Sequence, residues 1–208
     1  MRESIKRIVW PYQDSYSPNG IIGEKDACGV GFIANIKGIE SNWILKQSLK
    51  GLNCMEHRGG CGGDSDSGDG AGILCSIPWG FLDEELNLIN KQKLDRGLGM
   101  VFMPNKKEKI EECKSICEEE AEKLSIKETS WRKVPVNNEI LGPLAKANAP
   151  FICQWILYID KKKHQDVERL LFQLRKRIEK KIRETFKNDV GDCEFYFASL
   201  SSQTVVYK

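Results

Sequence analysis

The sequence contains no C-x-x-C pair and only two histidines, although it has eight cysteines. The spacings that zinc sites and redox-active cysteine pairs commonly use are therefore missing, and the cysteines are not clustered as iron–sulfur ligands are. We expect no metal site in this chain, and we interpret the cysteines as half-buried thiols in a reducing compartment. The scarcity of histidine also limits how a cysteine nucleophile could be activated.

An excess of charge and a long apolar run are also absent. The 32 basic and 30 acidic residues give a formal net charge of +2, which provides no general attraction for nucleic acid or an anionic membrane. No stretch approaches the roughly 20 apolar residues of a transmembrane helix. The N-terminus has no apolar core of signal-peptide length. It contains acidic residues, which argue against a transit peptide because such peptides are poor in them. We expect an ordinary globular domain of a protein that is not exported.

Regular patterning begins only after residue 27. Residues 1–27 mix proline, glycine and polar residues without a period, which predicts an extended leader. The apolar segment 28–36 predicts a buried strand, and the spacing of apolar residues predicts helices over 42–55, 106–123 and 165–186. Further strands are predicted at AGILCSIP, LGMVFMP, KETSWRKVPV, PFICQWILYID, CEFYFASL and SQTVVYK. Interleaved strands and helices indicate an α/β or α+β domain.

The last predicted strand runs to Lys208 without a turn or a polar tail. We expect on this ground a piece of a longer protein. Ahead of the last two predicted strands, residues 161–187 carry eleven Lys or Arg against four acidic residues, so nucleic-acid binding has to be weighed. The apolar stripe of this helix is continuous, however, and we interpret its charges as a solvated outer face.

Eight of the 18 glycines lie between residues 51 and 72. The segment has no basic residue between Arg58 and Lys91, which excludes a phosphate-binding P-loop, and its glycines do not match G-x-G-x-x-G. A calcium loop is excluded because Asp69 and Cys75 occupy the positions of the required Gly and Glu. Asp64, Asp66 and Asp69 are suited to accept hydrogen bonds from turn amides. Two interpretations stay open here, namely turn chemistry alone and a backbone scaffold around a substrate.

Cys28 opens the first predicted strand and is followed directly by a glycine. A buried cysteine is most often a small apolar residue. Alternatively Cys28 is a nucleophile paired with His57, although the spacing does not prove this. In a third arrangement the chain is cut before Cys28. The freed amine, with a pKa of about 7.7–8.0, then takes the thiol proton and no histidine is needed.

Several motifs carry a resemblance that covers nearly the whole chain from about residue 24. CGVGFIANIKG, the helix after it, CMEHRGGCGGDSDSGDGAGILCSIPW and SLSSQTVVYK resemble, in this order, the N-terminal amidotransferase domain of glutamate synthases. The residues of these motifs are most similar to those of the ferredoxin-dependent form of cyanobacteria and plastids. EHRGG is similar to the HRG loop that class II glutamine amidotransferases share, and SGDGAG is typical of the glutamate synthase branch.

The resemblance implies an α+β fold of the N-terminal nucleophile type, a four-layer αββα sandwich that is truncated at its C-terminus here. Residues 1–27 would be a propeptide, cleaved between Ala27 and Cys28, and residues 28–208 a partial class II amidotransferase domain. Cys28 would attack the side-chain amide of glutamine, form a glutamyl thioester and release ammonia, with its own amine as the base.

The resemblance also implies supporting residues and partners. The supporting loop would contain His57, Arg58, Gly59, Gly60, Asp69 and Gly70. In the parent enzyme, ammonia would pass to 2-oxoglutarate at a distant site that holds FMN and a 3Fe-4S cluster and receives electrons from ferredoxin. No cofactor is expected within this chain. The expected location is the cytoplasm of a cyanobacterium-like cell or the plastid stroma, with no nucleic-acid or membrane partner.

Two motifs of the family are absent from the sequence. The arginine that grips the substrate carboxylate lies in a motif of the type HSRFSTNT, and the oxyanion-hole pair lies in HNGE; neither string occurs here. We therefore expect little activity from this chain alone. Two alternatives stay open, namely a non-catalytic remnant or interaction module that keeps the fold, and another class II amidotransferase such as a phosphoribosylpyrophosphate or asparagine enzyme.

Overall fold

The computed structural model describes residues 29–60, 64, 66–68, 70–86, 94–160, 164–187 and 194–208, with the Arg58 side chain outside this set. The elements are, in chain order, α1 (Asn42–Asn53), η1 (Glu56–Arg58), β1 (Ile73–Ser76), α2 (Trp79–Leu86), β2 (Asp95–Met103), α3 (Lys107–Lys123), β3 (Glu128–Lys133), η3 (Asn138–Ile140), α4 (Pro143–Ala147), β4 (Phe151–Ile159), α5 (Val167–Thr185), β5 (Tyr196–Ser201) and β6 (Thr204–Tyr207).

The strands form two antiparallel sheets. The larger sheet has the order β3-β4-β2-β5, and the smaller one pairs β1 with β6. Strands β2 and β4 pair along their whole length, from Asp95 opposite Ile159 to Met103 opposite Phe151. Seven consecutive residues of each strand are buried. Because successive side chains of a strand point to opposite faces, both faces of the larger sheet must be covered.

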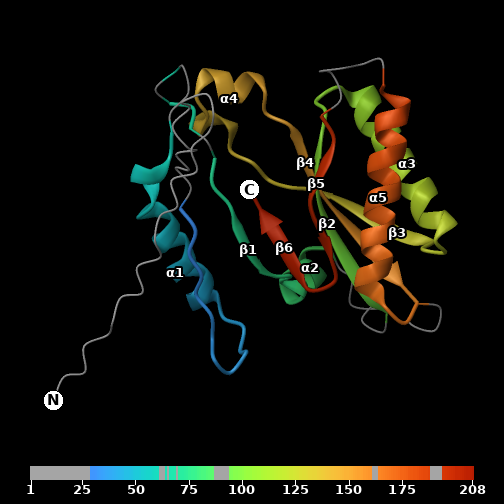
Figure 1. Ribbon diagram of the computed structural model, residues 1–208, viewed down its shortest axis with the longest axis horizontal. Helices are drawn as coiled ribbons and strands as arrows, with labels where there is room; N and C mark the ends of the chain where they lie inside the picture. Colours follow the sequence, from blue (N-terminus) through green and yellow to red (C-terminus); the bar gives the residue numbers. More distant parts are fainter. Residues whose placement is uncertain are drawn as a thin grey trace, which may run out of the picture.

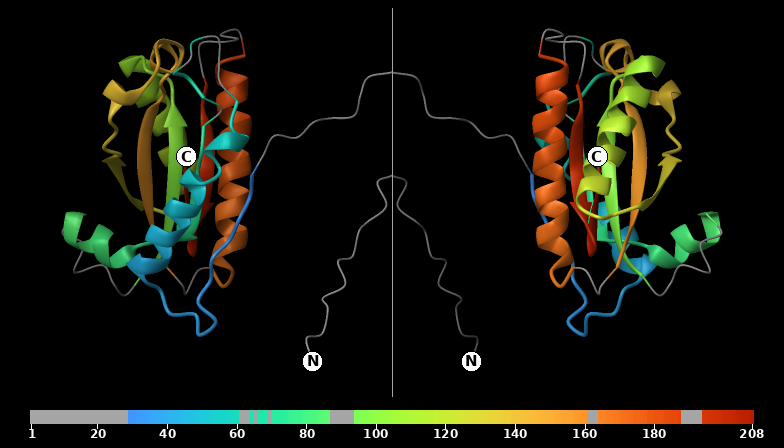
Figure 2. Two further views of the ribbon diagram at one scale, coloured as in Figure 1. Left: turned by 90° about the vertical axis from the view of Figure 1, so that its left-hand side faces the viewer. Right: turned by 90° about the vertical axis from the view of Figure 1, so that its right-hand side faces the viewer.

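Different layers cover the two faces. Figure 1 shows α3 and α5 on one side of the larger sheet and the β1–β6 pair on its other side, with α1 beyond β1; Figure 2 shows the same arrangement from the sides. Strand β6 therefore lies between β1 and the larger sheet. The structure confirms mixed α/β content with antiparallel sheets, and the complete αββα sandwich stays a prediction.

The helix-covered face holds the larger core. Leu170, Leu171, Leu174, Ile178 and Ile182 form the buried stripe of α5, as the apolar spacing predicts. They pack with residues of α3, β2 and β4 in one apolar cluster. The helix comes so close to the sheet that a Cβ atom at Gly97 would lie 2.9 Å from both methyl groups of Leu171. The sheet therefore needs a glycine at this position of β2.

The opposite face packs against the smaller sheet and α2. Leu98, Met100 and Phe102 of β2 form this second cluster together with residues of β4, α2 and β6. Two arginines hold α2 to the sheet, namely Arg96, which contacts Asp83 and lies 4.1 Å from the Trp79 ring, and Arg132, which contacts Glu85. Helix α2 is not among the elements that the apolar spacing of the sequence predicts.

Most predicted elements are confirmed, but one strand prediction is wrong. Residues 29–36 form no strand, and Val30, Phe32 and Ile36 are 93%, 94% and 103% exposed. An apolar run becomes a strand only where a neighbour satisfies its backbone groups, and no described strand pairs with this segment. Residues 1–28, including the predicted leader, lie outside the described residues. None of the described helices is long and apolar enough to cross a membrane.

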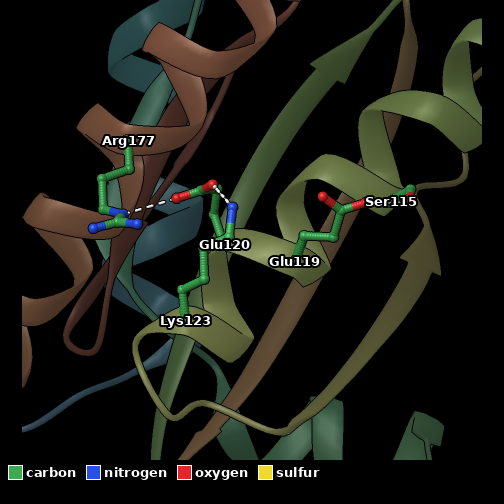
Figure 3. A network of polar contacts seen from close by, with 5 residues as sticks. All are labelled: Ser115, Glu119, Glu120, Lys123 and Arg177. Carbon is green, nitrogen blue, oxygen red and sulfur yellow. Dashed lines mark hydrogen bonds and ion pairs between the residues drawn. The ribbon is translucent and has the colours of Figure 1, made fainter.

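A carboxylate joins α3 to α5 at the edge of the core. Glu120 of α3 has a side chain only 7% exposed and accepts a bond of 2.8 Å from Arg177 of α5 and one of 2.5 Å from Lys123. Figure 3 shows this network and, one residue away, Glu119 paired with Ser115 instead. Burial alone would raise the pKa of Glu120, but the two cations and their hydrogen bonds lower it overall.

We predict that Glu120→Gln lowers the free energy of unfolding by about 1–2 kcal/mol at pH 7, because two charge-assisted bonds become neutral ones and both cations are half exposed. Since the folded pKa is depressed, the contribution is complete above the unfolded glutamate pKa of about 4.3 and is lost as the pH falls through the folded value. Urea unfolding of both proteins at pH 7 and pH 3 measures this difference.

Glu119→Gln is the matched control, since Glu119 is exposed and bonded to Ser115 at 3.2 Å. It should change the unfolding free energy by less than about 0.5 kcal/mol at either pH. A loss for Glu120→Gln that is as large at pH 3 as at pH 7 would contradict the assigned role of the Glu120 charge.

Candidate functional site

Gly29, which follows the predicted nucleophile Cys28, lies beside the end of α1. A Cβ atom at Gly29 would lie 2.8 Å from Sδ of Met55, which is closer than real Cβ atoms come. Met55 directly precedes η1, the 3-10 turn that contains His57 and Arg58. The residue adjacent to the predicted nucleophile is thus packed against the predicted HRG loop. Ala27 and Cys28 themselves lie outside the described residues, so the Cys28–His57 pair is untested.

The HRG turn is held by local hydrogen bonds. The His57 ring Nδ1 lies 3.0 Å from the carbonyl oxygen of Cys54, and the Gly59 amide donates to Glu56 O at 3.0 Å. A carbonyl oxygen can only accept, so Nδ1 is the donor in this contact. The geometry fixes the orientation of His57, while the Arg58 side chain is outside the described residues.

The glycine loop, residues 59–72, contains positions that only glycine satisfies easily. Gly70 has φ +90°, in the left-handed region. A Cβ atom at Gly72 would lie 2.9 Å from the carbonyl oxygen of Tyr207 in β6, and one at Gly68 would touch Gly60 O at 3.6 Å. The loop therefore contacts the end of β6 through its backbone, and it folds back on the residues that directly follow η1. Asp69 lies outside the described residues.

Asp64 connects the glycine loop to α4. Its carboxylate accepts from the Ser67 amide at 2.8 Å, from Ser67 Oγ at 2.9 Å and from the Leu144 amide at 2.8 Å. The Leu144 amide bond, followed by the bonds from Ser67, lowers the pKa of Asp64. The bond from Ser67 N confirms the predicted turn chemistry, whereas the bond to α4 was not predicted. Pro143 at the first helical position was the available signal for this short helix.

These contacts answer part of the question about the glycine loop. Asp64 bonds the loop to α4, Gly68 packs it on the end of the HRG turn and Gly72 packs it on β6, so it is more than a chain of isolated turns. The same HRG turn follows Met55, the residue that Gly29 contacts. The predicted supporting residues Gly59, Gly60 and Gly70 all belong to this backbone structure.

Five cysteines lie within the described residues, and all of them are free thiols, namely Cys54, Cys75, Cys113, Cys117 and Cys153. Burial raises the pKa of Cys117 well above its usual range and that of Cys153 to about 12. A thiol that stays protonated is a weak nucleophile. In the described part of the chain, no group of three or more His, Cys, Asp or Glu side chains is placed to hold a metal ion.

We predict opposite effects for two exposed glycines. Gly70→Ala should lower the free energy of unfolding by about 1–2 kcal/mol, because alanine resists a positive φ. Gly51→Ala should raise it by about 0.5–1 kcal/mol, since Gly51 lies in α1 and an added methyl group would meet no atom within 4 Å. Urea unfolding tests both. A stabilising Gly70→Ala would contradict the left-handed conformation of this loop.

We also predict that Asp64→Ala loosens α4. The Leu144 amide loses its acceptor, so its hydrogen exchange should accelerate by about fivefold or more, as expected when an amide in the first turn of a helix loses its capping partner. Asp64→Asn keeps one acceptor oxygen and should give a smaller acceleration. Unchanged exchange at Leu144 and Ala145 in the alanine variant would show that Asp64 does not hold this helix.

Comparison with known proteins gives a consistent result. The family described as "Glutamine amidotransferases class-II" matches residues 28–208. Ferredoxin-dependent glutamate synthase 1 of Arabidopsis thaliana is 44% identical over 192 residues, which are 90% of this chain and 12% of that protein. Ferredoxin-dependent glutamate synthase 2 of Synechocystis is 41% identical over 90% of this chain and 12% of its own length. The Pyropia yezoensis enzyme is 41% identical over 98% of this chain and 13% of its own.

The chain thus spans about an eighth of the length of these relatives. The family match covers all of the described elements, from Gly29 beside the HRG turn to β6. On this match, the chain belongs to the class II glutamine amidotransferases.

Proposed function

We propose that residues 28–208 are the glutamine amidotransferase part of a ferredoxin-dependent glutamate synthase. The observation that carries the proposal is the family match, which begins at residue 28 and is accompanied by relatives that are 39–44% identical over about 90% of the chain. The contact of Gly29 with Met55 supports it, because it brings the chain next to Cys28 against the HRG turn.

Cys28 is the proposed nucleophile after removal of residues 1–27 between Ala27 and Cys28. In the uncut chain the backbone nitrogen of Cys28 is an amide and has no basicity. After cleavage it is a free amine with a pKa of about 7.7–8.0. It takes the thiol proton, and the sulfur attacks the side-chain amide carbon of glutamine. The proton then goes to the leaving nitrogen, ammonia departs and a glutamyl thioester forms. Water hydrolyses the thioester to glutamate and restores the thiol.

The glycine loop and the HRG turn are the proposed supports of this nucleophile. His57, Arg58, Gly59 and Gly60 would form the wall beside Cys28, and Asp69 with Gly70 would continue it. A backbone wall is suitable because its amides donate hydrogen bonds without needing side-chain order. The alignment with the Pyropia yezoensis protein covers 98% of this chain and therefore includes most of residues 1–27 as well as the proposed domain.

The remaining functions of the parent are assigned to parts outside this sequence. The substrate-arginine and oxyanion-hole motifs of the family are not in the 208 residues, and a single oxyanion donor is worth about 2.7–4 kcal/mol of barrier. We therefore propose that the chain alone hydrolyses glutamine poorly. FMN, the 3Fe-4S cluster, ferredoxin and 2-oxoglutarate would bind elsewhere in the parent, and we assign none of their ligands to this chain.

The proposed fold and location follow from the same family. The elements would belong to an αββα sandwich, with α1 and the α3–α5 pair as its outer layers and further strands of the parent extending the β1–β6 sheet. The named relatives include chloroplast proteins and a Synechocystis protein. The proposed location is the plastid stroma or a cyanobacterium-like cytoplasm, with glutamine as substrate and no nucleic-acid or membrane partner.

We predict that Cys28→Ala in the full-length parent lowers the glutaminase kcat by at least about 10³-fold, because the nucleophile is lost. Cys54→Ala is the control, since Cys54 is an exposed thiol just before the HRG turn; it should retain kcat within about twofold. The measurement is glutamate release from glutamine. A Cys28→Ala enzyme with normal turnover would overturn the proposed function.

A further inference from the structure

A buried polar side chain lies inside the apolar layer between the two sheets. Gln154 of β4 is 1% exposed, on the same face of the strand as Ile156 and Tyr158 of the second core. A buried amide is costly unless its donors and acceptor find partners. Its Oε1 accepts from Arg132 Nη1 at 3.1 Å, and its Nε2 donates to the phenol oxygen of Tyr207 at 3.4 Å. The three side chains thus span the layer from β3 to β6.

Arg132 is the anchored end of this chain of contacts. Its side chain is 12% exposed, and its guanidinium lies 3.4 Å from Glu85 of α2 and 5.6 Å from the centre of the Phe81 ring. Since both residues belong to α2, the Arg132 group is held by the helix as well as by the larger sheet. Gln154 therefore bonds to a fixed donor on one side and to the smaller sheet on the other.

Tyr207 transmits this constraint to the glycine loop. It is paired with Ile73 at the start of β1, and its carbonyl oxygen is the atom that a Cβ at Gly72 would approach to 2.9 Å. The next bond along β6 is from the Val206 amide to Ser199 Oγ of β5, at 3.0 Å. The end of β6 is thus attached at two successive residues, directly beside Gly72. In Figure 1, β6 lies beside β1, with its end next to the start of that strand.

We propose that the Gln154–Tyr207 contact positions the glycine loop for catalysis, so that Gln154 and Tyr207 are positioning residues of the amidotransferase site. The inference rests on the proposed function. The path runs from Arg132 through Gln154 and Tyr207 to Gly72, and through the loop backbone to Gly68 and the HRG turn. Burial raises the pKa of Tyr207, so the phenol stays protonated and keeps its hydrogen-bonding role at neutral pH. Both residues would act through the glycine loop rather than on the substrate.

The test uses the full-length parent enzyme with Gln154→Leu, Tyr207→Phe and the double variant. Each single variant should lower the glutaminase kcat by about tenfold and leave the KM for glutamine within about twofold, because the loop shifts while the substrate contacts persist. The double variant should be no slower than the worse single variant, since the contact that Tyr207→Phe breaks is already broken in Gln154→Leu.

Two controls separate positioning from stability. Ile178→Val and Ile178→Ala remove graded volume from the helix-side core, where Ile178 is fully buried. They should shorten the half-life of thermal inactivation while leaving kcat at 25 °C unchanged. A Gln154→Leu enzyme that behaves like these controls, or a double variant whose losses multiply, would overturn the inference.

Failure of this inference is distinguishable from failure of the proposed function. An inactive Cys28→Ala enzyme together with normal kcat in Gln154→Leu and Tyr207→Phe would reject only the positioning role. An active Cys28→Ala enzyme would reject the proposed function itself, and the positioning role would fall with it.

Discussion

The burial of both faces of β2 and β4 is the constraint on which the rest of this structure depends. One face requires the apolar stripe of α5. The helix comes so close to the sheet that β2 has a glycine, Gly97, opposite Leu171. The other face requires the β1–β6 pair, which brings the end of β6 against Gly72. The glycine loop is therefore placed by the packing of the sheets, and its own glycines allow the approach.

Charge and hydrogen bonding then refine what apolar packing begins. Glu120 joins the two outer helices, and Asp64 joins the glycine loop to α4. Each carboxylate is held by donors from different elements, so each one couples segments that are far apart in the sequence. Such bonds contribute little free energy compared with the two cores, but they add links between elements that are polar and directional.

The sequence was sufficient for the elements with strong periodicity and insufficient for those defined by tertiary contact. The stripe of α5 and the apolar runs of β2 and β4 predict their elements within a few residues. The run at residues 29–36 has the same character but has no pairing partner among the described strands. Helix α4 and the links through Leu144 and Tyr207 depend on long-range contacts that no local pattern encodes. Cys28 was a candidate nucleophile from its place before a glycine at the start of an apolar run, and the motif resemblance selected this role among the three that were open.

The most direct measurement is mass spectrometry of the parent enzyme after labelling with a glutamine-like chloroketone. We predict a mature chain that begins at Cys28, with one adduct on its thiol, a free α-amine and protection by glutamine. The exposed Cys54 serves as the internal reference for nonspecific labelling. Active enzyme that retains Ala27, or a glutamine-protected adduct on another cysteine, would contradict the account.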